Sequence, residues 1–246
     1  MPAILIVGAT RGLGAALVQY YSSNPSFGTS NTIYATTRSS SPPVDDWAKK
    51  QNVHWLLNVD LEKGLEAAAK LAQQITVKGD LYSNSGSSED KPSETSLAGP
   101  EGSDGKVNTV IITAGYFATE QYGESKWDEQ VKMYTFSSVA PVFVVEALDK
   151  QGCLVDGATK IILVSSESGS ITMRHEQEGG GNFGHHGSKA ALNMVGKQLS
   201  FDLKDRNIGV GIVHPRYVMH IEAVAAIDLI FRSLLPCTVL LHRSLY

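Results

Sequence analysis

The amino-acid sequence predicts one α/β domain in which a parallel β-sheet is covered by helices on both faces, a three-layer, doubly wound arrangement. Short apolar runs rich in β-branched residues alternate with segments of helical periodicity, as they do where crossover helices join parallel strands. The chain has 246 residues, which is enough for one large α/β domain and too few for two of ordinary size. We therefore expect a single domain over residues 1–246.

Six strands are expected, and the last residues leave room for a short seventh strand. The apolar runs that predict the strands are Ile4–Val7, Thr32–Thr37, His54–Leu57, Val107–Thr113, Lys160–Ser165 and Ile208–Val213. Helical periodicity between these runs predicts helices at Leu13–Ser22, Leu65–Ile75, Lys126–Leu148 and Ser188–Leu203.

Three segments depart from this alternation. Residues 82–105 are rich in Ser, Gly, Glu and Pro and bury too little apolar surface to offset the entropy of ordering, so we expect a mobile surface insertion. Residues Glu176–Gly184 form a second glycine-rich loop. Residues 221–246 are an atypical, shortened C-terminal segment, in which charged residues and a proline interrupt the apolar pattern. These interruptions favour a buried helix over a membrane anchor.

Composition and charge argue against several classes of partner. The formal net charge of −4 and the isoelectric point near 6.0 provide no basic field for nucleic acid. The two cysteines, Cys153 and Cys237, have neither metal-ligand nor disulfide-framework spacing, which predicts a reducing compartment and no metal site. Met1 leads directly into the first apolar run, which leaves no room for a signal peptide. We expect a cytoplasmic protein that acts on small molecules, with no nucleic-acid or membrane partner.

A glycine-rich turn follows the first predicted strand and opens the first predicted helix. Its glycines are Gly8, Gly12 and Gly14, with Thr10, Arg11 and Leu13 between them. Glycines at such a junction permit a tight turn and let backbone N–H groups approach a diphosphate, whose charge then sits at the positive end of the helix dipole. Because the strand, the turn and the helix occur in the required order, a dinucleotide site is preferred over a plain turn.

The end of the second predicted strand indicates which dinucleotide is bound. An acidic residue there would hold the ribose 2′-hydroxyl of NAD, whereas an Arg would accept the 2′-phosphate of NADP. This chain has Arg38 at that position and no acid before Asp45, and Arg11 adds a second cation from the turn. Because Arg pairs with phosphate through bidentate, charge-assisted hydrogen bonds, we expect NADP(H) as the cofactor. The alternative is that Arg38 is a solvated cation at the end of a strand.

The glycine spacing resembles the TGxxxGxG turn of the short-chain dehydrogenase/reductase family, and the similarity extends from Met1 to about Val218. The pattern is most similar to the sniffer/C-factor-like branch. The resemblance implies a Rossmann fold and further cofactor contacts: at Asp60 near the adenine, at Ala114-Gly115 after the fourth strand, and at Val218 near the nicotinamide. Asn58 is a competing alignment for the Asp60 position.

The same resemblance assigns a catalytic group that departs from the family pattern at two positions. Ser166 matches the serine that polarises the substrate carbonyl, and Lys189 matches the lysine that binds the nicotinamide ribose and lowers the pKa of a tyrosine. That tyrosine position holds His185, four residues before Lys189, and the position of the relay asparagine holds Ser137. Because a neighbouring cation makes an imidazole harder to protonate, we expect His185 to be mostly neutral at pH 7. Carbonyl reduction should then be slow or shifted toward acidic pH, unless His185 serves as the base for oxidation.

The resemblance implies an NADP(H)-dependent oxidoreductase that transfers hydride between NADPH and a carbonyl or alcohol substrate. The alternative is a catalytically impaired NADP(H)-binding protein, a sensor or partner module, because the family's Tyr and Asn are both replaced. A non-redox reaction on the same fold has no positive sign in the sequence. Family members pair through the helices that we predict at Lys126–Leu148 and Ser188–Leu203, so the resemblance implies a homodimer or homotetramer.

Overall fold

The computed structural model describes residues 3–24, 32–83 and 104–215. They form one six-stranded sheet in the order β3-β2-β1-β4-β5-β6, in which every pairing is parallel. The strands are β1 (Ala3–Val7), β2 (Thr32–Thr36), β3 (Val53–Leu56), β4 (Thr109–Ile112), β5 (Lys160–Val164) and β6 (Gly209–Val213). The predicted parallel sheet is confirmed, and each strand begins and ends within two residues of its predicted bounds.

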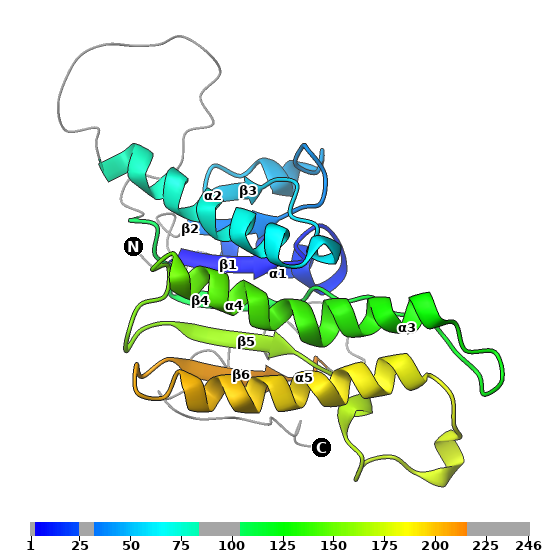
Figure 1. Cartoon of the computed structure of the whole chain (residues 1–246). Coiled ribbons are helices and arrows are strands. Elements are labelled where there is room, and N and C mark those ends of the chain that lie inside the picture. The colour runs from blue at the N-terminus through cyan, green and yellow to red at the C-terminus, as the bar shows by residue number, and fades with distance from the viewer. Residues whose placement is uncertain (1–2, 25–31, 84–103, 216–246) are drawn as a thin grey trace.

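The order of the strands reverses at β1, which lies between β2 and β4 (Figure 1). Ile4 is in register with Ile33 of β2 on one side and with Thr109 of β4 on the other. At such a switch point the chain leaves neighbouring strands in opposite directions, which opens a crevice at their carboxyl ends. The topology therefore places a candidate site where β1, β2 and β4 end.

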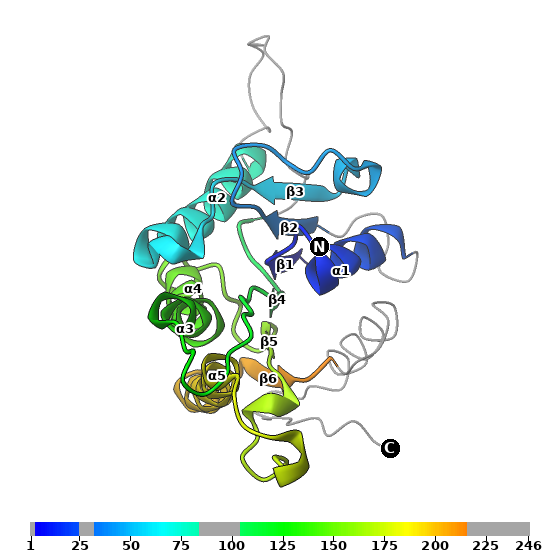
Figure 2. The same cartoon turned by 90° about the vertical axis from the view of Figure 1, so that its right-hand side faces the viewer.

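Helices cover both faces of the sheet and complete the three layers (Figure 2). The helices that pack on it are α1 (Gly12–Ser23), α2 (Leu65–Ser83), α4 (Ala140–Lys150) and α5 (Phe183–Asp202). On one face, Leu17 of α1 packs in a cluster with Ile4 and Ile6 of β1. On the other face, Leu5 of the same strand packs in a cluster that includes Leu71 of α2. Successive side chains of a strand point to opposite faces, so one strand supplies both cores.

The helix predicted at Lys126–Leu148 is confirmed as one continuous helical run. It comprises α3 (Trp127–Tyr134), a π-helical turn η4 (Thr135–Val139) and α4. By length and composition alone this run could cross a membrane, but half of its most apolar stretch is buried inside the fold, as in a core helix. The π turn matters for the site because such turns often occur at functional positions, and this one carries Ser137.

Helix α5 begins at Phe183, five residues before its predicted start at Ser188. The residue before it, Asn182, has a left-handed backbone with φ of 48° and so forms the boundary between the loop and the helix. The longer helix places His185 within the first turn of α5, on the same helix as Lys189.

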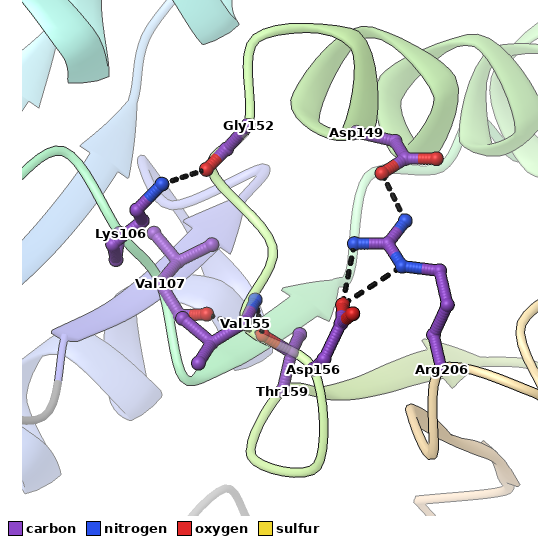
Figure 3. Close-up of polar contacts among 8 residues, drawn as sticks. All are labelled: Lys106, Val107, Asp149, Gly152, Val155, Asp156, Thr159 and Arg206. Atoms are coloured by element: carbon purple, nitrogen blue, oxygen red, sulfur yellow. Dashed lines mark hydrogen bonds and ion pairs between the residues drawn. The ribbon is translucent and has the colours of Figure 1, made fainter.

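Polar contacts link the loops at the amino ends of the strands, on the side opposite the cavity (Figure 3). Arg206, which precedes β6, pairs with Asp149 at the end of α4 and with Asp156 before β5, the latter at 2.8 Å. The Nζ atom of Lys106, which precedes β4, donates to the carbonyl of Gly152 at 2.5 Å. These contacts hold the connections between elements on the side away from the candidate site.

Several predictions fall outside the described residues. They are most of the insertion at 82–105, Val218, Cys237 and the C-terminal segment 221–246. The helix α2 continues to Ser83, so it reaches the first residues of the predicted insertion. The organisation of residues 1–246 as a single domain stays a prediction.

Candidate functional site

A cavity of about 510 Å³ opens at the carboxyl ends of β1, β2 and β4, within the range of about 300–1,000 Å³ that is typical of small-molecule sites. Its walls include the glycine-rich turn, the ends of β2 and β4, and residues of α3 and η4. It contains nine of the residues that the sequence predicts to bind the cofactor: Gly8, Thr10, Arg11, Gly12, Leu13, Gly14, Arg38, Ala114 and Gly115.

The glycine-rich turn packs closely on the end of β4. A Cβ atom on Gly14 would overlap the carbonyl oxygen of Gly8 and lie 2.8 Å from the Thr113 hydroxyl, and a Cβ atom on Gly8 would lie 2.7 Å from the amide nitrogen of Ala114. The Thr113 hydroxyl donates to the Val7 carbonyl at 2.9 Å, which ties the turn to β4. Gly12 has a left-handed backbone with φ of 56° and open space around it. The turn therefore needs glycine for the reasons that a diphosphate-binding turn needs it.

The electrostatics of the cavity favour an anion. Helix α1 starts beside it with no side-chain cap and no acidic residue in its first turn, so the positive end of its dipole is unneutralised there. Arg11, Arg38 and Lys132 lie in the lining, and none of the described residues of the lining is acidic. Arg11 and Arg38 are exposed and form no ion pair with another described residue. Two unpaired guanidinium groups beside a helix N-terminus suit a ligand with several phosphates.

One wall of the cavity was not predicted from the sequence. Tyr116 and Lys132 line it, and the Lys132 ammonium lies 5.0 Å from the centre of the Tyr116 ring. Lys132 also pairs at 2.9 Å with Glu62, which lies in the short helix η3 (Leu61–Lys63) after β3. A side-chain hydrogen bond with Glu62 is the main reason that the pKa of Lys132 is raised. A side-chain hydrogen bond with Glu129 is likewise the main reason that the pKa of Tyr116 is raised. No local sequence signal marks this wall, because packing between distant segments creates it.

Asp60 lies beside the cavity but is not part of its described lining. Its carboxylate accepts a hydrogen bond from the amide of Glu62 at 3.3 Å and so caps η3. A role of Asp60 at the adenine stays a prediction, and Val218 lies outside the described residues.

Ser166 lies just after β5, and the side chain of Lys189 reaches the last residue of this strand, both outside the cavity lining. The Nζ atom of Lys189 donates to the carbonyl of Val164 at 3.0 Å, and burial lowers the pKa of this ammonium to about 8. The Ser166 hydroxyl accepts from the amide of Ser168 at 3.1 Å and caps the short helix η5 (Glu167–Gly169). Gly169 touches α5 so closely that a Cβ atom would lie 2.6 Å from the carbonyl carbon of Lys189. The serine segment and the lysine are therefore held together.

His185 is half-buried in the first turn of α5. Its ring packs edge-on against Phe117, with the ring centres 4.9 Å apart. Its Nδ1 atom is buried and has no hydrogen-bond partner among the described residues. The pKa of the imidazole is lowered to about 4, first by burial and then by the charges of Lys189 and His186. His185 is thus neutral at pH 7, in the direction that the sequence predicts, although burial contributes more than the lysine.

Ser137 lies in the π turn η4 and is 1% exposed. Its hydroxyl is also buried and has no hydrogen-bond partner among the described residues. Nearly all buried polar atoms in folded proteins are hydrogen-bonded, so an orphaned hydroxyl marks a place where a ligand, a water molecule or a shift of the chain would supply a partner.

The segment after β4 joins the two parts of the site. Thr113 to Tyr116 line the cavity, and the next residue, Phe117, packs on His185. A ligand in the cavity would therefore lie beside the chain segment that contacts the imidazole. The cavity and the group of Ser166, His185 and Lys189 adjoin at neighbouring strands of one sheet, β4 and β5.

Fold and site together define a doubly wound, Rossmann-like α/β domain with a cavity at its switch point whose described lining carries cations and no acidic residue. No protein-family model matches the chain. The chain is 27% identical to an uncharacterized oxidoreductase of Schizosaccharomyces pombe over 232 residues, 91% of this chain and 76% of that protein. It is also 27% identical to the C-signal protein of Myxococcus xanthus over 118 residues, which are 46% of this chain and 67% of that protein.

The solved structures add agreement in fold. The NADPH-bound carbonyl reductase from chicken fatty liver superposes with a TM-score of 0.73 at 20% identity, covering 98% of this chain and 96% of that one. The carbonyl reductase Sniffer of D. melanogaster superposes with a TM-score of 0.63 at 24% identity, covering 87% and 80%. The resemblance that the sequence predicts is confirmed as a similarity: one curated relative is named as an oxidoreductase, and solved carbonyl reductases share the fold.

Proposed function

We propose that this protein is an NADP(H)-dependent oxidoreductase of the short-chain dehydrogenase/reductase type, which transfers hydride between the nicotinamide and a small carbonyl or alcohol. The observation that carries the proposal is the cavity: a glycine turn that a Cβ atom would fill, the free N-terminus of α1, and three cations with no acidic residue in the described lining. Arg38 and Arg11 would hold the 2′-phosphate, and the amides of the turn would hold the diphosphate.

A bound nicotinamide would supply or accept the hydride. In this chain Ser166 accepts a hydrogen bond from a backbone amide, so its own O–H can be donated to the oxygen of the substrate. Lys189 is a mostly protonated ammonium at pH 7, with a pKa of about 8. It would keep positive charge beside the developing alkoxide. Neutral His185 can accept the proton of an alcohol in oxidation, whereas in reduction it donates poorly at neutral pH.

An apolar substrate fits the surroundings of His185. Phe117 is 58% exposed while touching the imidazole, and Phe183, in the same turn of α5, is 43% exposed. Solvent-exposed aromatic rings beside a polar reacting group are typical of pockets that accept apolar molecules. We therefore propose an apolar ketone or alcohol of small to medium size as the substrate.

A second candidate function is NADP(H) binding without turnover, in a sensor or partner module. The specific observation in its favour is the burial of His185, which lowers the pKa of the imidazole to about 4 and makes it a poor proton donor at neutral pH. NADPH oxidation, followed by absorbance with a panel of carbonyl compounds from pH 5 to 8, separates the two. Turnover that disappears in Lys189→Met supports the enzyme. Saturable NADPH binding with no turnover at any pH supports the module.

We also propose a homodimer or homotetramer that works in the cytoplasm on a small molecule, without a nucleic-acid or membrane partner. Exposed apolar side chains on the outer helices support self-association: Val131 and Tyr134 on α3, and Met194 and Phe201 on α5. Sedimentation velocity at micromolar concentration tests this proposal, and a purely monomeric protein would contradict it.

A further inference from the structure

Glu120 is a buried carboxylate that none of the site assignments above uses. It is 7% exposed and lies in the segment that runs from β4 to α3. Its Oε2 atom accepts a hydrogen bond from the amide of Gly184 at 2.7 Å, and its Oε1 atom accepts one from Gln130 Nε2 at 2.8 Å. Gly184 is the second residue of α5, so Glu120 places negative charge at the positive end of this helix, across 64 positions of the sequence.

The backbone around Glu120 pairs with the residue that precedes α5. The Glu120 amide donates to Asn182 Oδ1 at 3.0 Å, and the Asn182 amide donates to the Glu120 carbonyl at 2.9 Å. Gly181 approaches so closely that a Cβ atom there would lie 2.6 Å from the Glu120 carbonyl oxygen. A Cβ atom on Gly184 would overlap Met133 and lie 3.0 Å from Glu120 Oε2. Both glycines are therefore required by the contact itself.

The same short segment also reaches His185. Phe117 lies three residues before Glu120 and packs edge-on against the imidazole at 4.9 Å between ring centres. His185 directly follows Gly184. The imidazole is thus fixed by its helix backbone, which Glu120 holds, and by its ring, which Phe117 covers. Both restraints come from residues 117–120, which continue the strand end that lines the cavity.

We propose that Glu120 is a positioning residue for His185: by capping the first turn of α5 it holds the imidazole against Phe117 in its half-buried position. The inference rests on the proposed function for its catalytic meaning, because only then does the position of His185 affect a reaction. The charged and titratable groups that act on the imidazole are Lys189 and His186 on α5 itself. From the facing segment, Glu120 bonds the helix backbone and Phe117 touches the ring.

The test is the protonation of His185 in the full chain, measured by NMR titration of the imidazole C2 protons from pH 3 to 8. The seven histidines are told apart with a His185→Gln variant. The variant Glu120→Ala removes both side-chain hydrogen bonds. The variant Glu120→Gln keeps an oxygen that accepts from the Gly184 amide, and its new NH₂ group can donate to the oxygen of Gln130 once the Gln130 amide has flipped. Glu124→Ala is the matched control, because Glu124 is an exposed acid in the same segment.

In the parent chain His185 should titrate with a midpoint near 4, since burial lowers its pKa to about 4. In Glu120→Ala the midpoint should rise by about one pH unit or more toward the free value of about 6.5. Glu120→Gln and Glu124→Ala should leave it unchanged. If Glu120→Ala does not fold, Gln130→Ala removes one bond only and should raise the midpoint by less.

An unchanged His185 midpoint in a folded Glu120→Ala or Gln130→Ala protein would overturn the proposal, as would a Glu120→Gln variant that behaves like Glu120→Ala. NADPH affinity, measured by calorimetry on the same variants, should stay within about twofold of the parent, because Glu120 is not in the cavity lining. If no variant binds NADPH, including the parent, the proposed function fails, while the titration still decides whether Glu120 positions His185.

Discussion

Replacing Gly14 with Ala should disrupt the cofactor cavity through the packing of the glycine turn. A methyl group there would overlap the Gly8 carbonyl oxygen and lie 2.8 Å from the Thr113 hydroxyl, closer than a Cβ atom normally approaches. Both neighbours belong to the rigid junction of β1 and β4, so α1 has to move away from the turn. Forced overpacking of this kind costs about 1–3 kcal/mol. At about 2 kcal/mol, the melting temperature of a domain of this size would fall by about 4–8 °C.

Gly14→Ala should weaken NADPH binding as well as lower the stability of the fold. The displaced turn would lose at least one charge-assisted hydrogen bond to the diphosphate, worth about 1.5–3 kcal/mol, and therefore tenfold or more in the dissociation constant. Gly180→Ala is the control: it is an exposed glycine outside the cavity lining, and its new Cβ would have no other atom within 4 Å. Calorimetric titration and thermal melts measure both quantities. Parental NADPH affinity in Gly14→Ala would refute the assignment of the turn.

Three further predictions concern charge. Arg38→Ala should weaken NADPH binding by about ten- to a hundredfold, because a charge-assisted pair is worth about 1.5–3 kcal/mol, while NADH binding, measured in parallel, should change little. Arg206→Ala should lower the free energy of unfolding by about 1 kcal/mol, since it removes the pairs to Asp149 and Asp156; Lys49→Ala, which removes one fully exposed pair, should have no measurable effect in the same urea titration. The free energy of unfolding should decrease as the pH falls from about 6.5 to about 4, because the unfolded chain binds a proton that folded His185, with its pKa of about 4, does not. The decrease should be no more than about 1–2 kcal/mol for a half-exposed group. If the free energy of unfolding of a His185→Gln variant depended on pH in the same way, the decrease would not come from His185.

The strands and most of the cavity lining were predictable because their signals are local. A run such as Ile4–Val7 is apolar and β-branched enough to identify a buried strand by itself, and the glycine turn that follows needs only its spacing to be recognised. Arg38 was predictable for a similar reason, since its place is counted from the end of a strand. The structure brings Arg38 and the turn together in one cavity.

The features that the sequence did not predict depend on contacts between distant segments. The start of α5 was placed five residues too late, because Gly184 and Gly187 are poor helix formers and the cap that compensates for them comes from Glu120. Lys132 and Tyr116 were missed at the cavity wall because the wall exists only after α3 packs beside η3. Burial of His185 likewise lowers its pKa more than Lys189 does, and periodicity cannot show how deeply one imidazole is buried.

The central claim is that the arginines at this switch point select a dinucleotide by its additional phosphate. The most direct measurement is a calorimetric titration of the parent chain with NADPH and with NADH, each at low and at high salt. The claim predicts that at low salt NADPH binds at least about tenfold more tightly than NADH. The difference between the two affinities should narrow at high salt, because salt screens the guanidinium groups. Equal affinities, tighter binding of NADH, or no binding of either dinucleotide would contradict it.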